Sequence, residues 1–148
     1  MKHSLEQLAA FQRVPMARGE LARHAAEVIR AAGGYHWVGL YDVTASHITA
    51  IAWTGPTAPQ HPTFPVTQGL NGAAVAQRGA VIVQDVRQDP RYLTTFGSTL
   101  AEAILPVFSS GGDVVGTIDV ESDRVNAFTA ADVAFLRRCA DVLAFLWG

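Results

Sequence analysis

The chain has 148 residues, 49% of them hydrophobic, and a formal net charge of −2. We expect one domain, residues 1–148, because a chain of this length buries a core large enough to fold without disulfides or metal. The near-neutral charge gives no reason to expect nucleic acid or an anionic membrane as a partner, and no apolar run approaches the length of a membrane span.

Cysteine and histidine usage narrows the chemistry further. The single cysteine, Cys139, excludes an internal disulfide and fits a reducing compartment, and Met1–Glu6 lacks the apolar core of a secretory signal. We therefore expect a cytoplasmic protein. The histidines are scattered without metal-ligand spacing, so we expect no metal and no cofactor.

Two helices are predicted before the first strand. Ser4 and Gln7 have the spacing of a capping box, which predicts a short helix as far as about Arg13. A second helix is predicted over residues 18–32, because its apolar residues recur at helical spacing and Gly33-Gly34 ends it.

The first strand is predicted over residues 36–43, where side chains alternate between two faces. Val38 and Leu40 face one side. Trp37 and Tyr41 face the other. The elements predicted next are a partner strand at 47–54, a proline-rich connection at 55–68 with a short edge strand at 63–66, a helix at 69–77, a buried strand at 80–83 and an irregular stretch at 88–99.

Two alternating runs, residues 102–108 and 112–122, predict an antiparallel hairpin. A two-residue loop at Ser110-Gly111 would pair Glu102 with Asp119 and keep the apolar positions on one face. Asp119 shares its face with Glu121, at a spacing of about 7 Å along the strand. The hairpin therefore predicts three carboxylates on one face.

The C-terminal helix is predicted to begin at a capping box formed by Thr129 and Asp132 and to reach about Trp147. Its apolar arc consists of Val133, Phe135, Leu136, Ala140, Val142, Leu143, Leu146 and Trp147. An arc this wide exceeds what one sheet face needs, which favours a homodimer through the terminal helices. Burial under the N-terminal helices explains the arc equally well. Cys139 on this helix is expected to be a buried structural thiol.

Together these elements predict an α+β fold, in which a central antiparallel sheet carries the terminal helices on its apolar face and the two irregular connections on its polar face.

The polar face holds the candidate ligand-binding residues Trp37, Tyr41, Glu102, Asp119 and Glu121. Antiparallel sheets often leave one face in water, but two large aromatic side chains seldom lie bare there. Clustered carboxylates in a covered cavity need cations, amines or protons to offset their charge. We therefore expect a small ligand with an ammonium group, held also by cation–π attraction.

Five stretches carry a resemblance to a known family: Tyr35–Tyr41, Val83–Val86, Ala103–Val107, Val115–Ser122 and Phe128–Asp132. In this order they resemble the motifs of GAF domains, and most closely those of free-standing GAF proteins that reduce free methionine-(R)-sulfoxide. In that family a tryptophan, a tyrosine and three acids line the ligand pocket. The resemblance assigns these roles to the same five residues that the strand alternation selects.

The sequence departs from that family at its redox cysteines. The matching positions carry His61, Asn71 and Thr95, which are expected to line the pocket but cannot form a sulfenic acid or a disulfide. Residues 126–132 also lack the lysine of the cyclic-nucleotide motif, and no Cys–His pair suits a bilin.

Three hypotheses for function follow. The first is a non-catalytic sensor or binding protein for an amine-bearing, amino-acid-like metabolite, whose signal would pass to a separate protein. The second is a dimeric interaction module with a vestigial pocket. The third, a methionine sulfoxide reductase, is disfavoured because Cys139 is predicted to lie across the sheet from the acids.

Overall fold

The computed structural model describes residues 1–94 and 97–148. Its helices are α1 (Lys2–Ala10), α2 (Arg18–Gly33), α3 (Gly69–Gln77) and α4 (Ala130–Val142), with 3-10 turns η1 (Phe11–Arg13), η2 (Val86–Gln88) and η3 (Ala144–Trp147). Its strands are β1 (Trp37–Val43), β2 (His47–Thr54), β3 (Thr63–Pro65), β4 (Val81–Val83), β5 (Ala101–Phe108) and β6 (Val114–Ser122). None of the described helices combines the length and the apolar character needed to cross a bilayer.

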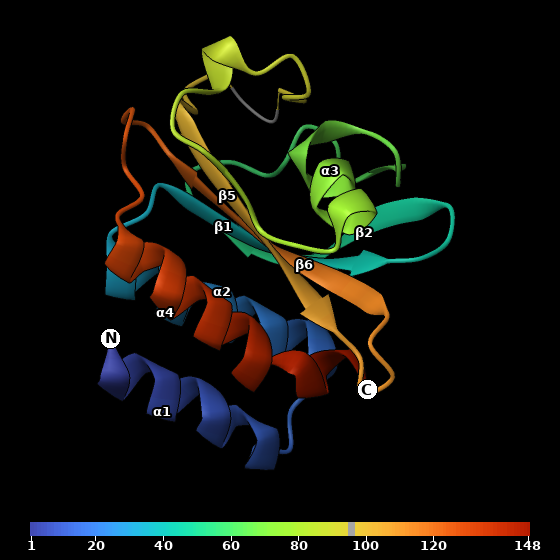
Figure 1. Ribbon diagram of the computed structural model, residues 1–148. Helices are drawn as coiled ribbons and strands as arrows, with labels where there is room; N and C mark the ends of the chain where they lie inside the picture. Colours follow the sequence, from blue (N-terminus) through green and yellow to red (C-terminus); the bar gives the residue numbers. More distant parts are fainter. Residues whose placement is uncertain (95–96) are drawn as a thin grey trace.

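The strands form a single antiparallel sheet in the order β3-β2-β1-β6-β5-β4. Helices α1, α2 and α4 lie on one side of this sheet, whereas α3 and the long connections lie on the other (Figure 1). The predicted α+β architecture is confirmed. Because β1 and β6 are neighbours at the centre, the strands that carry the candidate site residues lie side by side.

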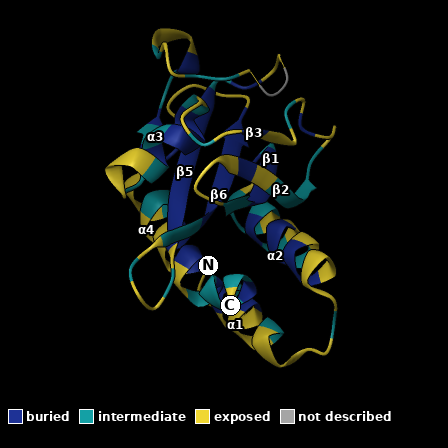
Figure 2. Ribbon diagram, turned by 90° about the vertical axis from the view of Figure 1, so that its right-hand side faces the viewer, coloured by how far each residue is buried: buried dark blue, intermediate teal, exposed yellow. Residues whose placement is uncertain are grey.

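The alternation of side chains divides the interior into two layers. Val38 and Leu40 of β1 join Val120 of β6 in the main core beneath the helices. Trp37 and Tyr41, the alternate residues of β1, pack instead in a separate cluster on the opposite face. Strands β5 and β6 are buried along most of their length, while the outer surfaces of the helices are exposed (Figure 2).

The first helix differs from its prediction. Helix α1 begins at Lys2 after Met1, which makes no side-chain cap, so Ser4 lies inside the helix and the predicted capping box is wrong. Leu5 and Leu8 are buried against the core. Packing of this apolar stripe, rather than a cap, stabilises the helix.

The hairpin between β5 and β6 has the predicted faces but a different register. Glu102 pairs with Glu121 instead of Asp119, because five residues, Ser109–Asp113, connect the strands and the register shifts at Val107/Phe108. The paired positions therefore move by two residues. A shift of two keeps every side chain on its face, so the three carboxylates still lie together.

Helix α4 has the predicted N-terminal capping box: Thr129 Oγ1 accepts a hydrogen bond from the Asp132 backbone N–H at 3.1 Å. The helix ends at Val142, and a 3-10 turn continues to Trp147. Leu136 and Leu143 have no exposed surface within the single chain, where α1 and α2 pack against α4. Most of the wide apolar arc is thus buried within one chain, with Val133, Val142 and Trp147 half-buried, and the dimer stays a prediction.

Candidate ligand-binding site

Three carboxylates meet on the face of the sheet opposite the helices. Asp119 and Glu121 lie two residues apart on β6, and Glu102 of β5 lies directly across from Glu121. One oxygen from each of the three lies within 4.8 Å of the others. The side chains are almost completely buried, with exposed fractions of 3%, 2% and 0% for Glu102, Asp119 and Glu121. We call these three residues the acid cluster.

Aromatic rings form one side of the site. The Trp37 ring stacks on Trp53 at 6.5 Å between centroids and lies 6.4 Å from Tyr41. The Trp37 indole N–H donates to the carbonyl of Thr57 at 3.1 Å, so the polar edge of this buried ring is paired. Phe64 of β3 meets Tyr41 edge-on at 6.0 Å. The predicted aromatic pair therefore adjoins the acid cluster and is covered by an edge strand.

Two polar side chains donate hydrogen bonds to the acid cluster. Asn71 Nδ2 donates to Asp119 Oδ2 at 3.0 Å, and Asn71 Oδ1 accepts from the Thr117 hydroxyl at 2.6 Å. The Thr99 hydroxyl donates to Glu121 Oε1 at 2.7 Å. These bonds fix one oxygen each of Asp119 and Glu121. No N–H group or alcohol hydroxyl of the described residues reaches Asp119 Oδ1.

Asn71 reaches the cluster because of how the chain enters α3. Gly69 has φ +72, and a Cβ on Gly72 would lie 2.8 Å from the carbonyl oxygen of Val66. Glycine is favoured at Gly69 by the left-handed backbone conformation and at Gly72 by the close approach of another backbone segment. The turn therefore places Asn71, in the first turn of α3, directly over β6.

A small cavity of about 20 Å³ adjoins the cluster. Its lining residues are Tyr41, His61, Phe64, Gly69, Leu70, Asn71, Leu93, Glu102 and Asp119. A volume of this size has room for about one water molecule. His61 and Asn71 lie in its wall, whereas Thr95 lies outside the described residues. Trp37 and Glu121 are not among the lining residues. Trp37 lies beside Tyr41, and Glu121 lies beside Glu102.

Burial controls the electrostatics of the cluster. Loss of solvent raises the pKa of Glu102 well above its usual range, and the charges of Asp119 and Glu121 raise it further. Burial also raises the pKa of Asp119, although hydrogen bonds from Glu102 and Asn71 act against it. Neither Glu102 nor Asp119 forms an ion pair with a basic side chain among the described residues. The cluster therefore needs protons or a bound cation to offset its charge.

Two of the residues that hold the acids were missed by the sequence analysis. Thr117 has the same alternation phase as Asp119 and Glu121, so the strand pattern contained the signal for it. Thr99 precedes β5 in a segment without regular structure, and its position carries no periodicity. Its contact with Glu121 is visible only in three dimensions.

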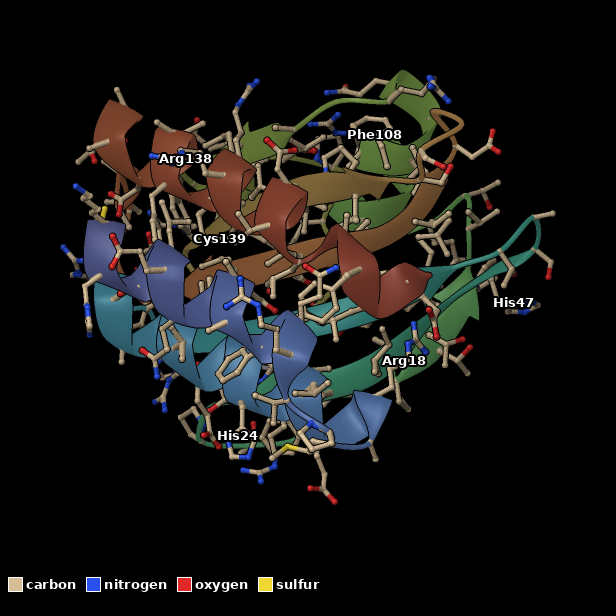
Figure 3. All side chains as sticks on the ribbon, turned by 90° about the horizontal axis from the view of Figure 1, so that it is seen from below. Arg18, His24, His47, Phe108, Arg138 and Cys139 are labelled. Carbon is tan, nitrogen blue, oxygen red and sulfur yellow. The ribbon has the colours of Figure 1, made fainter. Side chains whose placement is uncertain are left out.

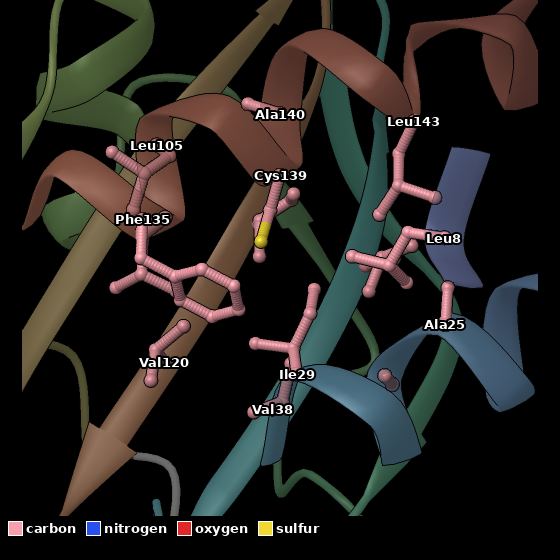
Figure 4. Packing of buried hydrophobic residues seen from close by; sticks show 14 of the residues in the cluster. Leu8, Ala25, Ile29, Val38, Leu105, Val120, Phe135, Cys139, Ala140 and Leu143 are labelled. Atoms are coloured by element: carbon pink, nitrogen blue, oxygen red, sulfur yellow. The ribbon is translucent and has the colours of Figure 1, made fainter. Parts of the chain in front are cut away.

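The only thiol lies on the other side of the sheet. Cys139 is fully buried in the main core beside Phe135 and Val120 (Figure 4), as expected of a structural thiol. In the view onto the helix layer, Arg138 projects outward whereas Cys139 lies inside (Figure 3). Burial raises the pKa of the Cys139 thiol to about 12, which keeps it protonated at neutral pH.

Comparisons with known proteins point in one direction. The family profile of the GAF domain matches residues 18–147. GAF domain-containing protein A of Dictyostelium discoideum is 29% identical over 110 residues, which cover 74% of this chain and 68% of that protein. The structure of a type II free methionine-R-sulfoxide reductase from Thermoplasma acidophilum has a TM-score of 0.81 and 32% identity, covering 88% of this chain and 94% of its own. A free methionine-R-sulfoxide reductase from Neisseria meningitidis, solved with its substrate, has a TM-score of 0.88 and 26% identity, covering 99% and 87%.

Proposed function

The chain belongs to the GAF domain family, and we propose that it binds a small amino-acid-like metabolite through the ligand's ammonium group, without thiol chemistry. One observation carries this proposal: three buried carboxylates converge within 4.8 Å, and neither Glu102 nor Asp119 has a basic partner among the described residues. An ammonium group offers three donors and one positive charge. Such a ligand would offset the charge of the acid cluster and satisfy Asp119 Oδ1.

The aromatic residues suit the rest of such a ligand. Tyr41, Phe64 and Leu93 line the cavity beside Glu102 and Asp119, so apolar walls stand next to the anionic end. Ligand sites commonly combine a few placed polar groups with apolar walls. The similarity to two proteins named for free methionine-R-sulfoxide makes methionine and its sulfoxides the first compounds to test.

Binding requires part of the wall to move. The cavity of about 20 Å³ is far too small for an amino acid. His61 and Phe64 belong to the connection between β2 and α3, and Leu93 belongs to the connection between β4 and β5. We propose that His61, Phe64 and Leu93 move outward with the described residues next to them to admit the ligand, while the sheet that carries the acids stays in place.

Reduction of a bound sulfoxide is the weaker candidate. In thiol-based reduction a thiolate attacks the sulfur, and the resulting intermediate is resolved by a second thiol. This chain has one cysteine, which is buried among the helices on the opposite face. The resemblance places His61 and Asn71 where the relatives have redox cysteines, and neither side chain can replace a thiol.

Isothermal titration with L-methionine and its (R)- and (S)-sulfoxides tests the proposal, with the matching compounds that lack the amino group as probes of the ammonium contact. We expect micromolar to millimolar affinity for at least one amine and at least about tenfold weaker binding of its amine-free analogue. Glu102→Gln should weaken binding by a similar factor. Asp113→Asn, which makes the same chemical change at the exposed hairpin turn, should leave it unchanged. Equal affinity for the amine-free analogue would contradict the proposal.

A thiol-dependent assay with free methionine-(R)-sulfoxide separates binding from reduction. We expect no turnover with the wild type or with Cys139→Ser. Turnover that Cys139→Ser abolishes would establish the reductase and overturn the assignment of Cys139 to the core.

A further inference from the structure

The acid cluster has the geometry of a cation site, independently of any amine ligand. Carboxylate oxygens are the preferred ligands of hard cations such as Ca²⁺, which they bind at 2.3–2.6 Å. Two oxygens on opposite sides of such an ion are therefore about 4.6–5.2 Å apart. The oxygens of Glu102, Asp119 and Glu121 all lie within 4.8 Å of one another, so one ion can touch all three.

A second observation distinguishes this cluster from an ordinary group of acids. Only 2% of the surface of Asp119 is exposed, and no N–H group or alcohol hydroxyl of the described residues reaches its Oδ1. This oxygen belongs to a side chain that lines the cavity of about 20 Å³. Apart from a proton shared with Glu102, only a small species in this space can satisfy that oxygen.

The surrounding hydrogen bonds also fit a cation. Asn71 donates to the other oxygen of Asp119, and Thr117 holds Asn71 in that orientation. Thr99 donates to Glu121 Oε1. Ligands of protein metal sites are held by such outer hydrogen bonds, which orient the carboxylate toward the ion.

The volume of the cavity determines whether a bare ion or a larger cation fits beside the acid cluster. In this closed conformation the cavity holds about one water-sized species, which excludes an amino acid but not a single ion. The histidine spacing gave no metal site, but hard cations do not require histidine. We propose that the closed form binds one hard divalent cation of the size of Ca²⁺ or Mn²⁺ between Glu102, Asp119 and Glu121.

The metal site does not require that an amine ligand exists. If both bind, they compete for the same carboxylates, so the ion would hold the closed form and the amine would displace it. Titration of the amine in the presence of EDTA therefore measures the proposed function alone. Loss of metal binding with retained amine binding, or the reverse, shows which of the two proposals fails.

The direct test uses Tb³⁺ as a luminescent substitute for Ca²⁺, because Tyr41 lines the same cavity and can transfer excitation to a bound lanthanide. We expect saturable luminescence with one ion per chain, and competition by Ca²⁺ and Mn²⁺ in calorimetry. Asp119→Asn should reduce the Tb³⁺ affinity by at least about tenfold, and Asn71→Ala by about tenfold, since Asn71 acts by positioning Asp119. Asp113→Asn is the matched control and should not change it.

Thermal unfolding guards against variants that fail to fold. Asp119→Asn removes one of three clustered charges, so in EDTA its melting temperature should equal or exceed that of the wild type. Ca²⁺ should raise the melting temperature of the wild type and of Asp113→Asn but not that of Asp119→Asn. The proposal is overturned if the wild type shows no saturable metal binding, or if Asp119→Asn keeps the wild-type affinity.

Discussion

Strand β6 presents two equally buried faces with opposite chemistry. Ile118 and Val120 point toward the helices and have no exposed surface, while Asp119 and Glu121 point away with exposed fractions of 2% and 0%. The apolar face is complete, because its neighbours on α2, α4, β1 and β5 fill it. The acid face is buried to the same degree but needs a counter-charge. The apolar face therefore stabilises the fold, and the acid face is placed to bind a ligand that carries positive charge.

The largest expected effect comes from moving a charge between the faces. Val120→Asp places a carboxyl group among Val38, Phe135 and the other residues of the main core. Nothing there can pair with it, so we expect a loss of more than about 4 kcal/mol of unfolding free energy. Urea denaturation followed by circular dichroism measures it. A folded variant of near wild-type stability would show that the helix side tolerates charge.

A substitution of Asp119, the residue next to Val120, tests the same difference between the two faces from the acid side. Asp119→Asn preserves shape and removes charge from the acid face, so the fold should keep its stability within about 1 kcal/mol while ligand affinity falls. If Asp119→Asn and Val120→Asp destabilised the protein equally, the two faces would not differ in the way described.

Much of this contrast was predictable from the strand pattern. Alternation alone assigned Val38 and Trp37 to opposite faces of β1, and both lie there. The assignment survived a register error, because a shift of two residues preserves the face of Glu102. The loop length was not predicted because the register shifts at Val107/Phe108; Pro106, which cannot donate to the ladder, lies directly before this irregularity.

The closure of the site was not predictable from periodicity. Asn71, in the first turn of α3, was placed at the pocket only by the family resemblance, and Thr99 reaches Glu121 from a segment without regular structure. Periodicity has no bearing on such segments. Phe64 lies on the predicted edge strand and Leu93 in an irregular segment, and local patterns do not show that both line the cavity of about 20 Å³.

Substitutions of Cys139 are expected to have an intermediate effect on the unfolding free energy, because this residue lies on the apolar face. Cys139→Ser introduces a hydroxyl group among apolar side chains and should cost about 1–3 kcal/mol, whereas Cys139→Ala should cost less because it buries no polar group. Both variants should bind ligand with wild-type affinity. The difference between the two variants in urea denaturation tests the apolar environment. Equal losses, or rapid labelling of the native thiol by an alkylating reagent, would contradict its placement.

A small, pH-dependent effect on stability is expected at Asp132, a carboxylate on the helix side that contrasts with Asp119. Its Oδ1 accepts from the Tyr35 hydroxyl at 2.7 Å, and its Oδ2 accepts from the Thr129 N–H and hydroxyl at 2.9 Å and 2.7 Å. Partial burial acts to raise the pKa of Asp132, but these hydrogen bonds outweigh it and the pKa lies below its usual value. Burial raises the pKa of Asp119, because the hydrogen bonds from Glu102 and Asn71 do not outweigh its loss of solvent.

The sign of the resulting pH dependence follows from the lowered pKa. A carboxyl group whose pKa is lower in the folded than in the unfolded state stabilises the fold above its unfolded pKa, about 3.9 for aspartate, and this contribution is lost as the pH falls through the folded value. Asp132→Asn replaces charged hydrogen bonds by neutral ones and should lower the unfolding free energy by about 1 kcal/mol at pH 6. The gap to the wild type should narrow steadily below about pH 4. Urea titrations of both proteins across this range measure the gap, and a gap that stays constant with pH would show that the Tyr35 and Thr129 hydrogen bonds do not favour the ionised form.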